Sequence, residues 1–145
     1  MPTPRSYAGA VSVGEKIYVI GGWNGSQALS TDEVFLPATV GASSKWIQAT
    51  PLPSGRYGMG ITNLADIIFV IGGNGPEDNL TSIALESGDK NWGQIEVPFQ
   101  SGWSYLGAVT IGTRLYALGG KTDEGFNDQM WSYQAIFTIT FPIVR

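Results

Sequence analysis

The side chains that most often perform chemistry in enzymes are scarce in this sequence. Its 145 residues include no histidine and no cysteine, so neither a Ser-His-Asp nor a Cys-His arrangement is available. The usual general base near neutral pH and the commonest metal ligand are therefore missing as well. Pairs of carboxylates could still act as acid and base. Three such pairs occur in or beside expected loops: Asp32-Glu33, Glu77-Asp78 and Asp123-Glu124. Because Asp and Asn are favoured in turns for backbone reasons, we interpret them as ordinary solvated turn residues.

Metals, cofactors and nucleic acids are also disfavoured. Asp78, Asp123 and Asp128 show no recognisable metal-binding spacing, so we expect no metal and no cofactor. The net charge is −4 and the eight Lys and Arg residues are scattered, which argues against nucleic acid as a partner. The sequence favours a binding protein over an enzyme.

The sequence predicts a soluble chain. It contains no run of about 18 apolar residues, so we expect no membrane span. Residues 1–5 contain no apolar stretch of the kind found in signal peptides. A cytoplasmic location follows if Met1 is the native start, whereas an extracellular one stays open for a fragment.

An apolar strand that ends in two glycines occurs three times, at residues 16–22, 67–73 and 114–120. The first glycines of these pairs, Gly21, Gly72 and Gly119, are 51 and 47 residues apart. Other positions keep the same register, since Arg56 precedes Gly72 by the same interval as Arg5 precedes Gly21. A period near 50 residues indicates a repeat architecture.

Each repeat predicts four short strands bounded by Gly and Pro. In the first repeat they cover residues 8–13, 16–20, 32–36 and 46–49, and in the second 58–64, 67–71, 81–85 and 92–97. In the third they cover residues 106–111, 114–118, 129–133 and 136–141. We divide this single domain into units of about 1–53, 54–100 and 101–145.

Four strands per unit, a double glycine after the second and a tryptophan opening the fourth (Trp46, Trp92) resemble Kelch repeats. Each such unit resembles one blade of a β-propeller, a twisted four-stranded antiparallel sheet. The third unit departs from this pattern in its second half, where Phe137 takes the place of the tryptophan. The resemblance implies an all-β fold of three four-stranded antiparallel Kelch-type blades.

The residue types suit such blades. We expect Gly9, Gly60 and Gly107 to let neighbouring innermost strands approach, and the double glycines to adopt positive φ. Larger side chains are expected to fill the space between blades (Tyr18, Phe69 and Tyr116) and to be buried as outer wedges (Trp46 and Trp92).

Three blades are too few to close a ring, because propellers close with roughly 4–8. Two apolar blade faces would stay open, which a soluble monomer rarely tolerates. We expect two copies to associate head to tail, each providing half of a six-bladed propeller. A fragment of a longer propeller without independent function, or an isolated half-propeller, are the alternatives.

The propeller resemblance implies that two sets of loops share one face around the central channel. These are residues 5–7, 54–57 and 101–105, before the first strands, and 23–26, 74–78 and 121–124, after the second strands. Kelch domains that capture peptides commonly use Arg, Tyr and Ser at such positions, and Tyr, Trp and Arg are typical interface anchors. Carried over by register, the candidate binding residues are Arg5, Tyr7, Trp23, Arg56, Tyr57, Trp103 and Tyr105.

Two features limit this prediction. Arg5 and Arg56 could instead brace neighbouring blades, and Trp103 stands where a third arginine would be, which argues against a triple-arginine pocket for acidic peptides. The predicted function is a non-enzymatic scaffold that binds a protein, peptide or glycan through this face. The alternative is a sugar-processing enzyme resembling Kelch-type sialic-acid mutarotases, with carboxylates or tyrosines as acid and base. Copper-radical oxidases, which share the fold, need histidine and cysteine and are excluded for this chain.

Overall fold

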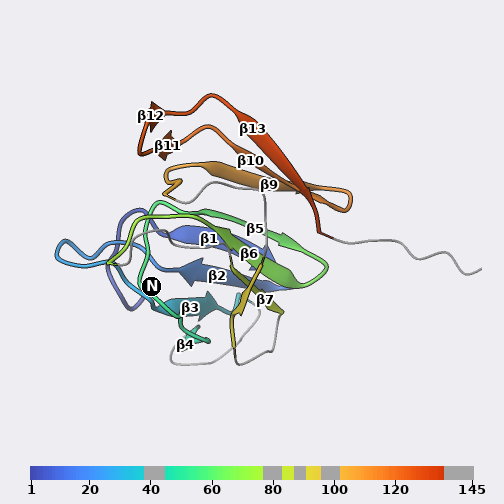
Figure 1. Cartoon of the computed structure of the whole chain (residues 1–145). Helices are drawn as coiled ribbons and strands as arrows, with labels where there is room; N and C mark the ends of the chain where they lie inside the picture. The colour runs from blue at the N-terminus through green and yellow to red at the C-terminus, as the bar shows by residue number, and fades with distance from the viewer. Residues whose placement is uncertain (38–44, 77–82, 87–90, 96–101, 136–145) are drawn as a thin grey trace, which may run out of the picture.

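A computed structural model describes residues 1–37, 45–76, 83–86, 91–95 and 102–135 of the chain. Within these residues it contains β-strands and no helix, arranged as antiparallel sheets that lie one beside the next (Figure 1). The predicted all-β class with blade-like sheets is confirmed. No helix in the described part of the chain has the length and apolar character needed to cross a membrane.

The first two sheets each have four strands in chain order. The first sheet contains β1 (Gly9–Val13), β2 (Lys16–Ile20), β3 (Asp32–Phe35) and β4 (Trp46–Gln48). The second contains β5 (Gly60–Leu64), β6 (Ile67–Ile71), β7 (Ile83–Glu86) and β8 (Gly93–Gln94). All neighbouring strands pair antiparallel, and each lies within or close to a range that the sequence predicted.

The third sheet is described as three strands in the order β13-β10-β9. These are β9 (Gly107–Ile111), β10 (Arg114–Leu118) and β13 (Met130–Gln134). A small hairpin that the sequence did not predict, β11 (Lys121–Thr122) and β12 (Gly125–Phe126), occupies the loop after β10. The predicted strand over 136–141, with Phe137, lies outside the described residues.

The sheets pack through their innermost strands β1, β5 and β9, and glycine makes this packing possible. A Cβ atom on Gly9 would lie 2.8 Å from the Cγ2 atom of Ile61, and one on Gly60 would lie 3.0 Å from the Cβ atom of Ala108. The predicted close approach is thus confirmed at the two junctions between sheets. At Gly107 a Cβ atom would meet only Leu118 of the same sheet, at 3.9 Å.

Apolar side chains fill both junctions. One cluster lies between the first two sheets and is built around Tyr18, Ile20, Val34, Ile68 and Val70, and a second joins the second and third sheets through Ile71, Trp103, Leu106 and Ala117. Tyr18 and Phe69 are buried as predicted, whereas Tyr116 is only half-buried.

The tryptophans of the fourth strands differ from the prediction, because both are half-buried. The Trp46 ring packs against Phe35, with 5.1 Å between ring centroids. Trp92 packs against the first cluster, and its Nε1 atom donates to the carbonyl of Thr50 at 3.1 Å. Trp46 begins β4 and Trp92 directly precedes β8, the short outermost strands of their sheets.

Candidate functional site

The side chains at the register of Arg5 all bind the double glycine of their own sheet. Each donates to the carbonyl of the first glycine, 16 residues later: Arg5 Nη1 to Gly21 at 2.7 Å, Arg56 Nη1 to Gly72 at 3.2 Å and Trp103 Nε1 to Gly119 at 2.6 Å. The indole N–H of Trp103 therefore takes over the role of a guanidinium group. What the three sheets share at this position is the hydrogen bond and not the residue type.

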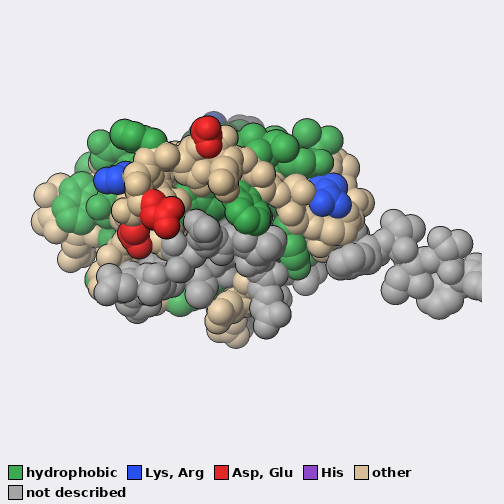
Figure 2. Space-filling model, turned by 45° about the horizontal axis from the view of Figure 1, so that its top comes forward, with side chains coloured by type: hydrophobic (Ala, Val, Ile, Leu, Met, Phe, Trp, Pro, Cys, Tyr) green, Lys and Arg blue, Asp and Glu red, His purple; other side chains and the backbone are tan. Residues whose placement is uncertain are grey.

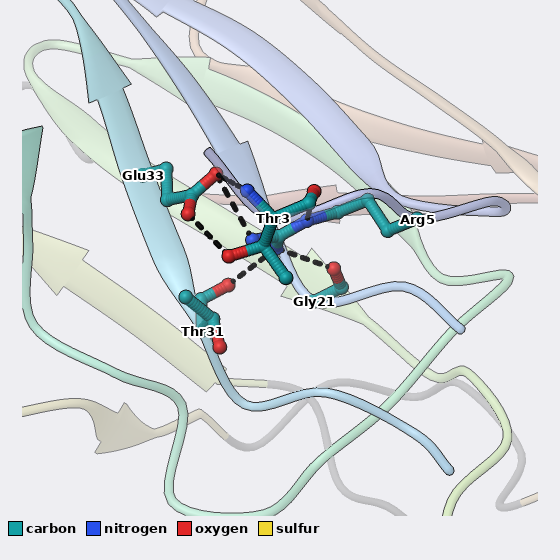
Figure 3. A network of polar contacts seen from close by, with 5 residues as sticks. All are labelled: Thr3, Arg5, Gly21, Thr31 and Glu33. Carbon is teal, nitrogen blue, oxygen red and sulfur yellow. Dashed lines mark hydrogen bonds and ion pairs between the residues drawn. The ribbon is translucent and has the colours of Figure 1, made fainter. Parts of the chain in front are cut away.

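Arg5 also forms the centre of a buried polar network (Figure 3). Its Nη1 atom donates to the carbonyl of Thr31 at 2.9 Å, and its Nη2 atom lies 3.1 Å from Oε2 of Glu33. Thr3 completes the network by donating its hydroxyl to Oε1 of Glu33 at 2.6 Å. The side chains of Arg5 and Glu33 are 0% and 1% exposed, so this ion pair is fully buried.

Three of the seven predicted contact residues therefore do not reach the surface. Arg56 and Trp103 are 2% and 1% exposed, and the Arg5 side chain is buried in its network. Their geometry agrees with the alternative in which these residues brace the sheets. They hold the loops of the candidate site in place but do not face a ligand, so we leave them out of the proposed contact surface.

The double glycines connect each sheet to the next one. The N–H of Gly22 donates to the carbonyl of Arg56 at 2.8 Å, and that of Gly73 donates to the carbonyl of Trp103 at 2.9 Å. All six glycines of the three pairs have φ between 60° and 107°, which confirms the predicted positive φ. This backbone conformation, which only glycine adopts without strain, fixes where the loops of adjacent sheets meet.

A row of backbone hydrogen bonds also crosses the three sheets just before their innermost strands. The N–H of Gly58 donates to the carbonyl of Tyr7 at 2.9 Å, and the N–H of Tyr105 donates to the carbonyl of Gly58 at 2.5 Å. All three residues have positive φ, at 53° for Tyr7, 65° for Gly58 and 55° for Tyr105. Left-handed backbone is uncommon for a bulky residue such as tyrosine, and here the row of hydrogen bonds holds it in place.

The remaining four predicted residues come together as one group, which we name the aromatic cluster: Tyr7, Trp23, Tyr57 and Tyr105. Ring centroids lie 5.3 Å apart for Trp23 and Tyr57, 6.2 Å for Tyr7 and Tyr57, 5.8 Å for Tyr7 and Tyr105, and 6.4 Å for Tyr57 and Tyr105. Tyr7 is 61% and Tyr105 48% exposed. The cluster joins lead-in segments of all three sheets with one loop of the first.

A difference in register explains how the three tyrosines fit together. Tyr57 occupies the position of Ser6 and Ser104, whereas Gly58 occupies that of Tyr7 and Tyr105. A Cβ atom on Gly58 would lie 2.9 Å from the ring of Tyr105, so that ring rests on the glycine. This one-residue shift of the tyrosine can be read from the aligned repeats, although we did not predict it.

Two hollows flank Tyr57. The polar hollow has a volume of about 380 Å³, and Asn74, Ser104, Lys121 and Asp123 line it together with Tyr57 and Tyr105. The apolar hollow has a volume of about 410 Å³ and lies between Trp23, Ala28, Tyr57 and Pro76. Both are built from the loops that the sequence placed on one face. Asn74 and Lys121 line the polar hollow but were not among the predicted contact residues, although both lie in loops that the sequence analysis placed on this face.

The phenol of Tyr105 stays protonated and neutral well above neutral pH. Loss of solvent raises its pKa above the ordinary value, and the charge interactions with Tyr57 and Tyr7 raise it further. A neutral phenol both donates and accepts a hydrogen bond. The cluster therefore presents aromatic faces together with hydrogen-bonding groups.

The carboxylate pair Asp32-Glu33 differs from the sequence prediction, because both residues are 1% exposed. They begin β3, and successive residues of a strand point to opposite faces. Glu33 reaches the ion pair with Arg5, while Asp32 shares the face of the buried Val34. Burial raises the pKa of Asp32 to about 7, against a lowering by Arg5 and a further rise from Glu33. Neither carboxylate lines either of the two hollows, so the pair is not placed to act as acid and base on a ligand bound there.

The other predicted carboxylates are distributed differently. Asp123 lines the polar hollow and is exposed, as are Glu124 and Asp128, whereas Glu77 and Asp78 lie outside the described residues. Within the part of the chain that the structure describes, no group of three or more Asp and Glu side chains is placed to hold a metal ion. The described site is therefore equipped for binding through aromatic, amide and single charged groups.

Comparison with known proteins gives a consistent result. A family model described as Kelch motif matches residues 4–53. Kelch-like protein 25 from Rattus norvegicus is 28% identical over 132 residues, which cover 84% of this chain and 22% of that protein. Kelch-like protein 40 is 29% identical over 138 residues in Mus musculus and 30% over 137 residues in Homo sapiens, in both covering 92% of this chain and 21% of the relative. The chain thus spans about a fifth of the length of these relatives.

Proposed function

We propose that this chain, which belongs to the Kelch-repeat family, is an interaction scaffold that binds a segment of a protein partner across the aromatic cluster. The observation that carries the proposal is the convergence of Tyr7, Trp23, Tyr57 and Tyr105 beside two hollows. Exposed aromatic side chains supply large contact areas at low cost in conformational entropy. Single exposed apolar residues are common on proteins, but a group of this kind marks an interaction site.

The spacing of the rings suits an extended peptide. Alternate side chains of an extended chain lie about 7 Å apart, which is close to the 6.4 Å between the rings of Tyr57 and Tyr105 and somewhat longer than the 5.3 Å between those of Trp23 and Tyr57. Tyr57 lines both hollows. A bound segment would place an apolar side chain in the apolar hollow and a polar side chain beside Lys121 and Asp123 in the polar hollow.

Other partners follow from the same chemistry. Aromatic faces also stack on sugar rings, so a glycan is the first competing ligand. A sugar-processing activity is the second, and among the described carboxylates Asp123 is the one that lines a hollow of the cluster. We also propose a second copy of the chain as a partner, through faces of the first and third sheets.

A random peptide library displayed on phage tests the proposal, with the affinity of synthesised hits measured by calorimetry. We expect enriched peptides with an apolar and a polar residue at alternating positions. Tyr57→Ala should weaken their binding about 10- to 30-fold, the loss typical of an interface hot spot. Ile47→Ala is the matched control, since Ile47 is 50% exposed on β4, outside the cluster; its affinity should equal that of the wild type.

Other outcomes of these experiments would contradict the proposed function. Failure to enrich any peptide, or equal affinities for the wild type and Tyr57→Ala, would overturn the proposal. Binding on a glycan array that is lost in Trp23→Ala and Tyr105→Ala would replace the protein partner by a sugar. Turnover of a sugar that requires Asp123 would replace the scaffold by an enzyme.

A further inference from the structure

The third sheet exposes a face that is buried in the other two sheets. Equivalent residues are 51 apart between the first and second sheets and 47 apart between the second and third. On the outer face of the third sheet Val109 is 43%, Ile111 65%, Leu118 38% and Met130 61% exposed. Ile20 and Ile71, the equivalents of Leu118, are both 0% exposed, and Ile83, the equivalent of Met130, is 5% exposed. In the space-filling view, hydrophobic side chains form several patches on the side that carries this sheet, with uncharged polar groups and some charged groups between them (Figure 2).

The first sheet exposes the complementary face. Ile17 is 40% exposed, whereas its equivalents Ile68 and Leu115 are fully buried. Ala10 and Ser12 on β1 are also exposed. Their equivalents Ile61 and Ala108, and Asn63 and Thr110, lie at the junctions between sheets. The chain thus contains two complete junctions and the two separate halves of a third.

The complete junctions define which groups must meet. The glycine of one innermost strand admits a side chain of the next sheet, as Gly9 admits Ile61. The second glycine of each pair donates its N–H to the carbonyl of the following sheet. At the second junction, the Thr110 hydroxyl also donates to the carbonyl of Asn63 at 2.8 Å.

The same groups are unused at the two open faces. Among the described residues, the N–H of Gly120 has no acceptor, although its equivalents Gly22 and Gly73 each donate across a junction. The row of hydrogen bonds through Tyr7 and Tyr105 likewise stops at both ends, since the structure shows no acceptor for the Tyr7 N–H and no donor to the Tyr105 carbonyl within the described ranges. The unused hydrogen-bond donors and acceptors at the open face of the third sheet therefore match those at the open face of the first sheet.

We propose that a second copy of the chain docks its first sheet on the open face of the third sheet, and that two copies joined twice in this way form a closed ring of six sheets. At each contact between copies, the N–H of Gly120 donates to the carbonyl of Arg5, and the N–H of Tyr7 donates to the carbonyl of Tyr105. Ala10 packs against Gly107, and the Ser12 hydroxyl donates to the carbonyl of Thr110. Six sheets lie within the range of closed propellers, and a head-to-tail contact that closes by rotation gives a finite oligomer.

Gly107→Gln tests this docking, because a side chain at Gly107 would fill the space that Ala10 of the second copy needs. The monomer tolerates the change, since its Cβ atom would have only an ordinary contact at 3.9 Å with Leu118 and the backbone φ is not positive. Gly93→Gln is the matched control on β8, where a Cβ atom also meets nothing closer than 3.8 Å.

Sedimentation equilibrium and light scattering of the purified full chain give the readout. The wild type and Gly93→Gln should have twice the 15.5 kDa mass of one chain, and Gly107→Gln should have the mass of a single chain. Ile111→Lys, at a position 65% exposed on the same face, should also give single chains. Circular dichroism shows whether each variant is folded. If Gly107→Gln does not fold, Ile111→Lys still tests the docking.

A wild type with the mass of one chain would overturn the proposal, as would a two-chain species that survives both substitutions. A series of longer assemblies would show docking without closure and would overturn the ring. The test is independent of the proposed function, because the mass is measured without a ligand and Tyr57→Ala should leave it unchanged.

Discussion

We expect Asp32 to make the free energy of unfolding of this protein fall as the pH rises. Its side chain is 1% exposed, and its carboxylate oxygens have no hydrogen-bond partner in the described structure. The equivalent residues of the other sheets are the apolar Ile83 and Met130. An unpaired carboxylate on such a face disfavours its own charged form, and burial raises its pKa from 3.8 to about 7 even though Arg5 opposes the shift.

The sign and size of the effect follow from proton linkage. Between pH 4 and 7 the folded protein keeps the proton on Asp32, whereas the unfolded chain has released it, so the free energy of unfolding falls as the pH rises. The stabilisation is complete below the unfolded pKa of 3.8 and is lost once the pH passes about 7. With about 1.4 kcal/mol for each pKa unit, the whole change is about 4 kcal/mol, of which about 3 kcal/mol falls between pH 5 and 8.

Urea denaturation of the wild type and Asp32→Asn at pH 5 and pH 8 measures this effect. Asparagine keeps the shape of the side chain but cannot ionise, so the difference between the two proteins isolates the Asp32 carboxyl from all other titrating groups. We expect Asp32→Asn to gain about 3 kcal/mol relative to the wild type on moving from pH 5 to pH 8.

Asp66→Asn is the control, because Asp66 is exposed in the turn between β5 and β6. Its stability difference from the wild type should be the same at both pH values. A wild type whose stability relative to Asp32→Asn stays constant, or rises, between pH 5 and 8 would refute the reasoning. In that case the Asp32 carboxylate is solvated or paired in solution.

Three further substitutions test the buried ion pair, the contact between sheets and the backbone strain in a turn. Arg5→Met leaves the buried Glu33 carboxylate without its cation, so it should lower the free energy of unfolding by about 3–5 kcal/mol. Urea denaturation measures this loss, and the double variant Arg5→Met with Glu33→Met should recover most of it. Gly72→Ala places a Cβ atom against the carbonyl of Trp103 at a φ of 61° and should cost about 2–3 kcal/mol, seen as a lower midpoint in thermal melting. Ala65→Gly, in the turn between β5 and β6, relieves a φ of 50° and should raise the melting temperature by about 2 °C, since about 1–2 kcal/mol of strain is removed and exceeds the entropy that glycine adds to the unfolded chain; an unchanged midpoint would show that the turn is not strained.

Most of the fold could be predicted because its signals are local and repeated. The ranges of β2 (Lys16–Ile20), β6 (Ile67–Ile71) and β10 (Arg114–Leu118) match their predicted ranges residue for residue, and every other described strand that was predicted lies within a few residues of its expected range. The double glycine is a backbone requirement that only one residue type meets without strain, so it is visible in one sequence. The hairpin β11–β12 was missed because its strands have two residues each and show no alternation.

The candidate site was less predictable because register gives a position along the chain and not the direction of a side chain. Arg5, Arg56 and Trp103 share the register of a surface loop, but each turns inward to a glycine carbonyl in its own sheet. Asp32 and Glu33 have the composition of a solvated turn, yet the neighbouring sheet and Arg5 bury them. Burial of this kind depends on contacts between segments far apart in the sequence.

The conformation of Tyr7 and Tyr105 gives independent support to a binding role for the aromatic cluster. Both residues hold a left-handed backbone, with φ of 53° and 55°, which costs a residue with a Cβ atom roughly 1–2 kcal/mol. The second sheet meets the same backbone requirement with Gly58, at a φ of 65° and without that cost. Burial of the two side chains does not offset the cost of the left-handed backbone, because Tyr7 is 61% and Tyr105 48% exposed. The row of backbone hydrogen bonds holds this conformation, and tyrosine in place of glycine adds two exposed aromatic rings to the cluster, which supports the proposed binding role.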